Sequence, residues 1–304
     1  MSVPAAYLGV ILIWSTTPLA IKWSGEGVGY LFGVTGRMLI GVVLAMLVLR
    51  LMRLRLSWGV TARQTYLAAG LGIYLAMTAI YWSAQLIPSG WVAVVFGLAP
   101  IVTGVMARLW LTERGLTPVR LAAILVALTG LGVIFTSGLH AGGQMVLGLA
   151  GVLFSVLCHS ASAVWIKRLN AGLHGLVVAA GGLLVATPLF LLTWLLQDGD
   201  LPTVTLVQTR TLWAIVYLGV IGSVLGFALY YYVLRHVETT RVALITLVTP
   251  VIALIIGQWL NGESVPLEVW LGTSLILLGL LIFELGSLVW QSNIQMIGRG
   301  WYRK

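Results

Sequence analysis

Long apolar runs alternate with short polar connections along the chain. A helix needs about 20 mostly apolar residues to cross the hydrocarbon core of a bilayer. Ten segments meet this requirement, at approximately residues 4–22, 31–50, 64–84, 90–111, 119–137, 145–166, 175–196, 209–234, 242–260 and 269–289. The pattern predicts an all-α membrane protein with ten transmembrane helices. Because most connections are short, consecutive helices are expected to be antiparallel neighbours.

The composition excludes a water-soluble globule. Apolar residues make up 60% of the chain, charged residues only 8%, and the mean hydropathy is +1.05. Soluble chains average about 25% charged residues, so lipid must cover most of this surface. The first apolar run contains Trp14 and Pro18 and ends in Lys22 rather than in a small-residue cleavage site. We therefore expect it to be a spanning helix that is retained, not a cleaved signal peptide.

The lysines and arginines predict the orientation in the membrane. If the N-terminus is placed inside, most of the 17 cations fall in the inner connections or in the C-terminal tail, while Lys22 and Arg210 fall outside and Arg37 within the second helix. Inner connections of membrane proteins carry such an excess, which predicts a multi-pass protein of the cell (inner) membrane with both termini in the cytoplasm. The same distribution accounts for the net charge of +9 without a nucleic-acid partner.

The two halves of the sequence resemble each other. A shift of 150 residues aligns the third and fourth predicted helices with the eighth and ninth, which matches Pro100 with Pro250 and Glu113 with Glu263. Five helices are an odd number, so the second copy would enter the bilayer upside down. Chance similarity among apolar helices is the alternative. The expected division is a first repeat at 1–138, an inverted second repeat at 139–290 and a cytoplasmic tail at 291–304. Secondary transporters often have this design, with the substrate site near the bilayer midplane.

Several of these residues also carry a family resemblance, which extends from Pro4 to about Leu288. The supporting motifs are Trp14-Ser15 followed by Lys22, the Gly36-Arg37 pair, and the two segments from proline to glutamate that end at Glu113 and Glu263. In these features the chain resembles the drug/metabolite transporter superfamily, and within it the EamA-type ten-helix carriers. The resemblance implies two inverted five-helix repeats around a central cavity, and transport of small metabolites.

Within that group, the chain is similar to exporters of aromatic amino acids, and the matching points are Trp14-Ser15-Thr16 and Tyr74. The resemblance would place an aromatic residue immediately before Pro100, where this chain has Ala99, so the identity of the substrate stays open.

Prolines and polar residues at membrane depth are the candidate functional residues. A proline inside a helix removes one hydrogen bond and kinks the helix. Such a kink can line a cavity, act as a hinge or serve packing alone. The hinge candidates are Pro18, Pro100, Pro188 and Pro250. Polar groups at this depth must face protein or water. Arg37 could contact a substrate carboxylate or bond helix-end carbonyls, and His159 could line the substrate path or bond a neighbouring helix.

Aromatic side chains with polar tips are expected to complete the cavity. An apolar pocket with a few polar groups suits a small organic solute, although tryptophan and tyrosine at helix ends are commonly interfacial anchors. The predicted cavity residues are Trp14, Thr17, Tyr74, Thr78, Tyr81, Phe96, Pro100, His159, Ser160, Trp165, Thr246, Thr249 and Pro250.

Missing motifs narrow the function further. The sequence places no Asp or Glu at a bilayer centre, which favours a facilitator or coupling through His159 over a carboxylate-based proton antiporter. It has no GxxxxGK[ST] motif of a built-in ATPase, no metal-binding motif and a single cysteine, so we expect no cofactor, no metal and no intrachain disulfide.

The sequence thus predicts a secondary transporter, not an enzyme, that exports small metabolites by alternating access, with amino acids (aromatic or other neutral) as the leading class. Its expected partners are a small-molecule substrate and the lipid bilayer; monomer and homodimer both stay open. Carriers of nucleobases, sugars or cationic drugs, a channel and a membrane enzyme are the alternatives.

Overall fold

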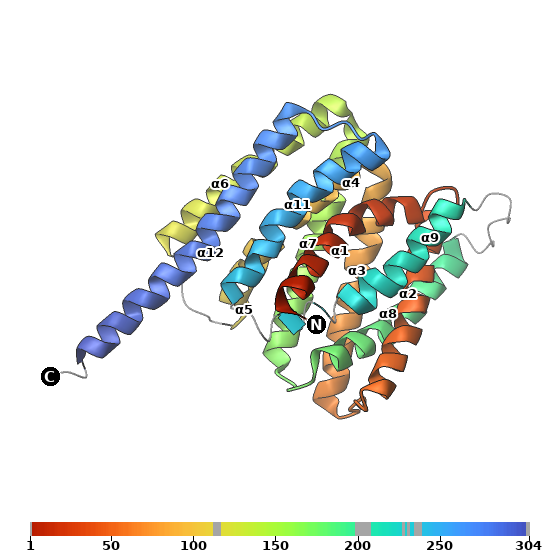
Figure 1. Cartoon of the computed structure of the whole chain (residues 1–304), viewed down its shortest axis with the longest axis horizontal. Coiled ribbons are helices and arrows are strands. Elements are labelled where there is room, and N and C mark those ends of the chain that lie inside the picture. The colour runs from red at the N-terminus through yellow and green to blue at the C-terminus, as the bar shows by residue number, and fades with distance from the viewer. Residues whose placement is uncertain are drawn as a thin grey trace.

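The chain folds into a bundle of helices in a computed structural model (Figure 1), which describes residues 2–111, 117–197, 208–226, 229, 232–233 and 239–301. No β-strand occurs in these residues. Glu113, which the repeat pairs with Glu263, lies outside them. The helices are α1 (Val3–Ser24), α2 (Tyr30–Leu51), α3 (Val60–Leu86), α4 (Ser89–Phe96), α5 (Ala99–Leu111), α6 (Pro118–Ala141), α7 (Gly143–Leu169), α8 (Gly175–Gln197), α9 (Thr209–Tyr217), the π-helix η1 (Leu218–Leu225), α11 (Thr239–Asn261) and α12 (Leu267–Trp301).

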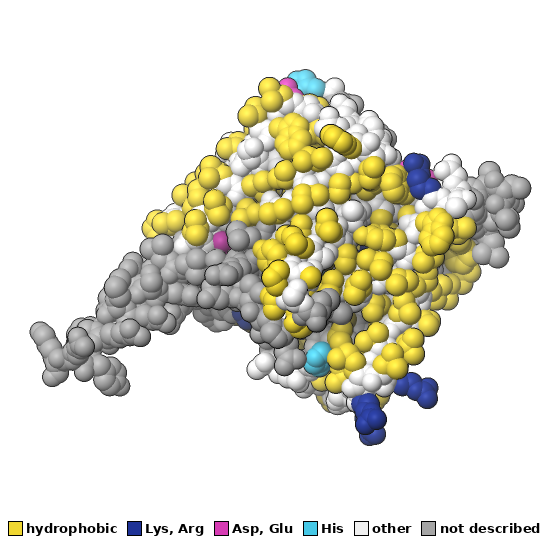
Figure 2. Space-filling model, in the orientation of Figure 1, with side chains coloured by type: hydrophobic (Ala, Val, Ile, Leu, Met, Phe, Trp, Pro, Cys, Tyr) yellow, Lys and Arg dark blue, Asp and Glu magenta, His cyan; other side chains and the backbone are white. Residues whose placement is uncertain are grey.

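The predicted membrane architecture is confirmed. Within the described residues, eight helical stretches are long and apolar enough to cross a bilayer, with α4 and α5 together forming one of them. Two shorter apolar helices, at Thr209–Leu225 and Ile245–Asn261, correspond to the other two predicted spans. Apolar side chains are spread widely over the described part of the surface in view (Figure 2). Such a surface is stable only against lipid, and the described part of the chain is an all-α membrane fold.

The two ends of the bundle differ in charge. Two hydrogen bonds fix α7 antiparallel to α3: Ser162 Oγ donates to the carbonyl of Ala68 at 2.9 Å, and Ser155 Oγ to that of Ala76 at 2.7 Å. The α2–α3 and α7–α8 connections therefore meet at the same end, the lower one in Figure 1. We call it the basic end because it carries the exposed cations Arg50, Arg53, Arg55, Arg63, Lys167 and Arg168. The α1–α2, α3–α4 and α11–α12 connections form the opposite end.

The predicted span at 90–111 is confirmed as one membrane-crossing stretch, Ser89–Leu111, but its helix is interrupted by a turn at Gly97 and Leu98 between α4 and α5. Pro100 is the second residue of α5, where its missing N–H has no helical partner to lose. It therefore begins a helix instead of kinking one. Glycine disfavours the helix interior, and a Cβ at Gly97 would lie 2.9 Å from the Val94 carbonyl oxygen and 3.5 Å from Pro250 Cγ.

The repeat-related Pro250 lies inside the continuous helix α11, and Pro18 and Pro188 lie inside α1 and α8. Two other predicted boundaries also differ. The span at 209–234 changes from α9 to the π-helix at Leu218. The last helix continues past residue 289 to Trp301, because hydropathy marks only the lipid-buried part of a helix.

A pair of threonines joins α2 to α8 in a reciprocal way. Thr35 Oγ1 donates to the carbonyl of Phe190 at 3.4 Å, and Thr187 Oγ1 donates to the carbonyl of Met38 at 3.4 Å. Thr187 and Phe190 each lie 152 residues after Thr35 and Met38. Each helix thus offers the same threonine-and-carbonyl pattern to the other.

Helices α6 and α12 approach each other through glycines. A Cβ at Gly130 would lie 2.5 Å from the carbonyl oxygen of Gly272, and a Cβ at Gly279 would lie 2.7 Å from that of Ala123. Membrane helices pack by such close backbone approach, because lipid gives them no hydrophobic drive to associate. The contact is again reciprocal, since Gly272 and Gly279 each lie 149 residues after Ala123 and Gly130.

We expect Gly130→Ala to lower the free energy of unfolding by about 1–3 kcal/mol, because overpacking a tight contact costs this much. Gly132→Ala is the matched control. A Cβ there meets nothing within 4 Å, and alanine gains up to about 1 kcal/mol over glycine in a helix interior. Thermal unfolding in detergent measures both variants. Equal melting temperatures for the two would contradict the close approach of α6 and α12.

Candidate functional site

A buried arginine is the centre of the candidate site. Arg37 lies in the first half of α2 and is only 5% exposed. Its Nε donates to Ser223 Oγ of η1 at 3.2 Å, and its Nη1 donates to the Tyr81 hydroxyl of α3 at 3.4 Å. Tyr81 itself is fully buried. The cation on α2 is therefore held by side chains of two other helical elements, η1 and α3.

The π-helix gives Ser223 its position. π-Helices are rare, short and frequently found at functional sites. The Ser223 hydroxyl donates to the carbonyl of Leu218, five residues earlier, at 2.9 Å. This hydrogen bond orients the hydroxyl, whose oxygen accepts from Arg37. On the preceding residue, Gly222, a Cβ would lie 3.9 Å from Arg37 Nη2 and 3.9 Å from Thr17 Oγ1. The absence of a side chain there leaves the guanidinium and Thr17 of α1 close to one small space. We call Arg37, Tyr81, Ser223 and Thr17 the Arg37 site.

Among the described residues, no acid pairs with the cation of the site. Within the described residues, neither of the ion pairs found involves Arg37, and its two hydrogen-bond acceptors are neutral hydroxyls. A buried cation at membrane depth is costly unless an anion or polar groups compensate it. Guanidinium groups bind carboxylates with two parallel hydrogen bonds. The Arg37 site is thus suited to a small organic anion.

Arg37 and Tyr81 of the Arg37 site are buried. A narrow cleft between α2, α8 and η1 is lined by Ser223, Val224 and Leu183, and its volume is about 20 Å³. This is room for about one water molecule, and an amino acid does not fit. A solute can reach Arg37 through this cleft only if the helices around it separate.

One aromatic residue predicted for the cavity, Tyr74, packs between α3 and α8. The Tyr74 hydroxyl lies 2.6 Å from Thr193 Oγ1, and its ring meets Phe190 edge to face with centroids 5.0 Å apart. Thr78 Oγ1 donates to the carbonyl of Tyr74 at 2.7 Å. On the far side of the Arg37 site, Trp14 Nε1 would lie 3.8 Å from a Cβ at Gly226. Tyr74, Tyr81, Thr17 and Trp14 therefore lie on the helices that surround Arg37.

A second group of predicted residues lies where α4 and α5 meet α7. The rings of Phe96 and His159 are 5.4 Å apart, and Thr103 Oγ1 donates to Ser160 Oγ at 2.9 Å. Ser160 is buried, whereas His159 is exposed. Pro100 is half-buried at this junction and Pro250 is buried against Gly97.

The remaining predicted residues do not join either group. Trp165 is 49% exposed on α7, and Pro188 is exposed on α8. Thr246 and Thr249 are half-buried along α11.

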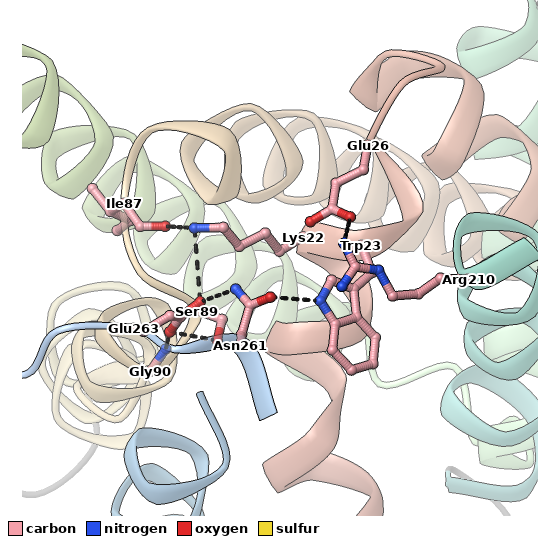
Figure 3. A network of polar contacts seen from close by, with 9 residues as sticks. All are labelled: Lys22, Trp23, Glu26, Ile87, Ser89, Gly90, Arg210, Asn261 and Glu263. Atoms are coloured by element: carbon pink, nitrogen blue, oxygen red, sulfur yellow. Dashed lines mark hydrogen bonds and ion pairs between the residues drawn. The ribbon is translucent and has the colours of Figure 1, made fainter. Parts of the chain in front are cut away.

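A charged network joins several helices at the opposite end of the bundle (Figure 3). Glu263, 8% exposed, lies 3.7 Å from Lys22 Nζ and accepts hydrogen bonds from Ser89 Oγ at 2.9 Å and Asn261 Nδ2 at 3.0 Å. Lys22 Nζ also donates to the carbonyl of Ile87 at 3.1 Å. This Glu263 network ties α1, the α3–α4 connection and the α11–α12 connection together.

Trp23 links this network to a second ion pair. Its Nε1 donates to Asn261 Oδ1 at 2.9 Å, and the guanidinium of Arg210 lies 5.1 Å from its ring centroid. Arg210 in turn pairs with Glu26. The two cations expected outside, Lys22 and Arg210, are thus both neutralised by acids of the same end.

Sequence reasoning missed Ser223, Ser89 and Asn261 as site residues. Ser223 gave no signal, because nothing in the local pattern distinguishes a π-helix from an α-helix. Glu263 was noted only as the repeat mate of Glu113. Its partner Lys22 lies at the other end of the chain, so their pairing is a property of the fold alone.

These features together define a class of protein. Apolar spanning helices enclose a buried cation, and a charged network links the helices at one end, features that fit a membrane transporter. The chain belongs to the EamA-like transporter family: the family model matches it twice, at residues 3–136 and 146–285.

Several curated relatives carry transporter names. An uncharacterized transporter of Archaeoglobus fulgidus is 27% identical over 64% of this chain and 68% of its own length. The uncharacterized inner membrane transporter YedA of Escherichia coli is 25% identical over 67% of this chain and 64% of its own, so this chain spans about two thirds of each of these relatives. A Streptantibioticus cattleyicolor protein named "Probable terminal-alkyne amino-acid exporter" is 27% identical over 71% and 70% of the two chains.

A solved crystal structure shares the fold. It superposes with a TM-score of 0.64 and covers 94% of this chain and 98% of its own, at 20% identity. At this identity the likeness supports the fold alone.

Proposed function

We propose that this transporter is a secondary carrier that exports small carboxylate-bearing metabolites, foremost amino acids, across the cell membrane by alternating access. The observation that carries the proposal is Arg37, a buried guanidinium with neutral partners and no acid beside it in the described residues. A substrate carboxylate supplies the missing charge. The amino-acid exporter among the relatives agrees with this class at low identity.

The aromatic wall supports the same substrate class. Tyr74 and Phe190 lie on α3 and α8, which flank the Arg37 site. An apolar or aromatic amino-acid side chain gains contact area and edge-to-face stacking on such a surface. The carboxylate would bind at Arg37 and the side chain against these rings.

We also propose that the two halves form an inverted repeat. The threonine pair between α2 and α8 and the glycine pair between α6 and α12 are both reciprocal, with residue offsets of 152 and 149. Reciprocal contacts of this kind are what a two-fold axis produces. In this proposal, a two-fold axis in the membrane plane relates a unit at 1–138 to an inverted unit at 139–290. The double match to the family model agrees with this division.

Alternating access follows from this symmetry. The Glu263 network closes the opposite end, and the cleft beside Ser223 is too small for an amino acid. The carrier would bind substrate at the basic end, then break the Glu263 network to release it at the opposite end. We assign the basic end to the cytoplasm, together with both termini, because inner connections carry the positive charge.

Counterflow in reconstituted liposomes tests this function. Vesicles loaded with an unlabelled amino acid are expected to accumulate the same labelled amino acid against its gradient, with saturation. The decarboxylated amine of the same amino acid is the matched control and is expected to exchange at least tenfold more slowly, because a charged hydrogen bond contributes about 1.5–3 kcal/mol. Equal exchange of the acid and the amine would contradict a carboxylate site. Ion currents at channel rates would contradict a carrier.

A further inference from the structure

Three arginines line one groove at the basic end, far along α2 from the Arg37 site. The groove has a volume of about 520 Å³. Arg50, Arg53 and Arg55 supply its charge, and its other lining residues are apolar: Met46, Leu49, Leu54, Leu56 and Trp58. Arginines at such a depth are commonly explained by orientation in the membrane alone. Orientation in the membrane explains why there are several arginines at this end. It does not explain why three of them line the same groove.

The backbone after α2 builds the groove. Arg53 has a φ of 55°, in the left-handed region that residues other than glycine rarely adopt. This turn allows the Leu54 N–H to donate to the carbonyl of Leu49 at 2.9 Å, five residues earlier. Further along, the Ser57 N–H donates to the hydroxyl of the buried Tyr66 at 3.2 Å. The segment is fixed at both points, so the arginines are held on a defined frame.

The three guanidiniums repel one another unless an anion lies between them. No carboxylate lines the groove, and in the described part of the chain none of the three arginines takes part in an ion pair. A phosphate accepts several charge-assisted hydrogen bonds at once and suits arginine best. The charge of the groove therefore calls for a phosphate group.

The apolar walls decide between a free phosphate and a lipid. Leu39, Val43 and Leu47 form an exposed stripe along α2, with 43%, 65% and 50% of their surfaces accessible. Residues four apart lie on one helix face, and this stripe ends beside Met46 at the rim of the groove. Trp58, 65% exposed, is the residue type that anchors at the lipid headgroup level. A soluble anion makes no contact with this apolar stripe, whereas the acyl chain of a lipid can pack along it.

We propose that this groove is a binding site for an anionic phospholipid, with the phosphate diester between Arg50, Arg53 and Arg55 and an acyl chain along the Leu39–Leu47 face of α2. Basic pockets at the cytoplasmic side of membrane proteins bind lipid headgroups in this way. The assignment is independent of the transported substrate, because the groove and the Arg37 site share no residue.

Lipid binding is measured on the full chain in neutral detergent, by thermal shift and native mass spectrometry with added phosphatidylglycerol. The test variant is R53Q/R55Q. The control R63Q/R168Q removes the same charge from exposed arginines of the basic end that do not line the groove. We expect the test variant to bind phosphatidylglycerol about 10- to 30-fold more weakly, since each basic residue near an anionic lipid contributes about 1 kcal/mol. The control is expected to bind like the wild type.

Three further arms make the outcome decisive. Phosphatidylcholine is expected to give no shift that depends on the arginines, and glycerophosphoglycerol, the headgroup without chains, is expected to give none at all. Unchanged lipid-free melting of R53Q/R55Q shows that the variant is folded. Equal losses in test and control variants would overturn the site, because they indicate attraction by net charge only. A shift with glycerophosphoglycerol as large as with the lipid would overturn the lipid assignment in favour of a soluble phosphate ligand.

Discussion

Arg37→Met is expected to reduce the affinity for carboxylate substrates by about 10- to 100-fold. Hydrogen bonds to charged groups contribute about 1.5–3 kcal/mol, and each 1.4 kcal/mol is a factor of about ten in a binding constant. Methionine fills a similar volume, and replacing a buried charge by an apolar side chain is often neutral or stabilising. Loss of binding without loss of thermal stability is therefore the expected result, measured as the concentration dependence of counterflow.

Smaller changes at the same site separate charge from hydrogen bonding. Ser223→Ala and Tyr81→Phe each remove one acceptor of the guanidinium but leave its charge, so they should weaken binding by less than Arg37→Met. Arg37→Lys keeps the charge but not the two-pronged geometry and should lie between them. Exchange of a decarboxylated amine should not change in Arg37→Met. Wild-type affinity of Arg37→Met for the amino acid would leave Arg37 with a structural role only.

Glu263→Gln should open the opposite end of the bundle. The substitution removes the charge opposite Lys22 and replaces an acceptor of Ser89 and Asn261 by an amide with one acceptor oxygen. Breaking a buried ion pair costs about 3–5 kcal/mol; because the Lys22 side chain is 23% exposed, we expect about 1–3 kcal/mol here. The closed arrangement should become about 10- to 100-fold less favoured relative to an open one.

Cysteine accessibility measures this opening. Ala20 is 6% exposed on α1. It lies about one turn after Thr17, toward the end of the helix that carries Lys22. In a Cys158→Ser background, which removes the one native cysteine, Ala20→Cys should react with a membrane-impermeant maleimide at least tenfold faster when Glu263→Gln is added.

Matched controls belong to the same end of the bundle. Glu26→Gln breaks the Arg210 pair, which is more exposed, and should change the labelling rate little. Lys22→Met should act like Glu263→Gln, and the double variant should show less than the sum of the two effects, because both remove one interaction. Unchanged labelling in Glu263→Gln would mean that the network only stabilises the fold. Additive effects would mean that Lys22 and Glu263 act separately.

These two predictions concern the two parts of a transport cycle. In the proposed transport cycle, the Arg37 site binds the solute and the Glu263 network keeps the opposite end closed. Thr17 and Lys22 lie on α1, which contributes to both. A movement of α1 that separates Lys22 from Glu263 therefore also changes the surroundings of Arg37, so the occupancy of the site and the state of the end can influence each other.

Much of the fold could be predicted from the sequence. Hydropathy placed the spanning segments because lipid forces each run of about 20 residues to be apolar and helical. The motifs around Trp14, Arg37 and the repeated prolines led to the correct family. Among the site residues, Arg37 stood out because a cation inside an apolar run is expensive.

The rest was decided by the tertiary structure. Hydropathy does not distinguish an α-helix from the π-helix at Leu218–Leu225, nor a kink at Pro100 from a helix that begins there. It also does not reveal that Arg37 meets Ser223, 186 residues later, or that Lys22 meets Glu263. A hydropathy pattern records only what faces lipid, whereas contacts between helices depend on small residues and on hydrogen bonds that span the whole chain. The sequence by itself therefore determined the class of protein and its spans, and only the packing of the helices determined which polar groups form the site and the closed end.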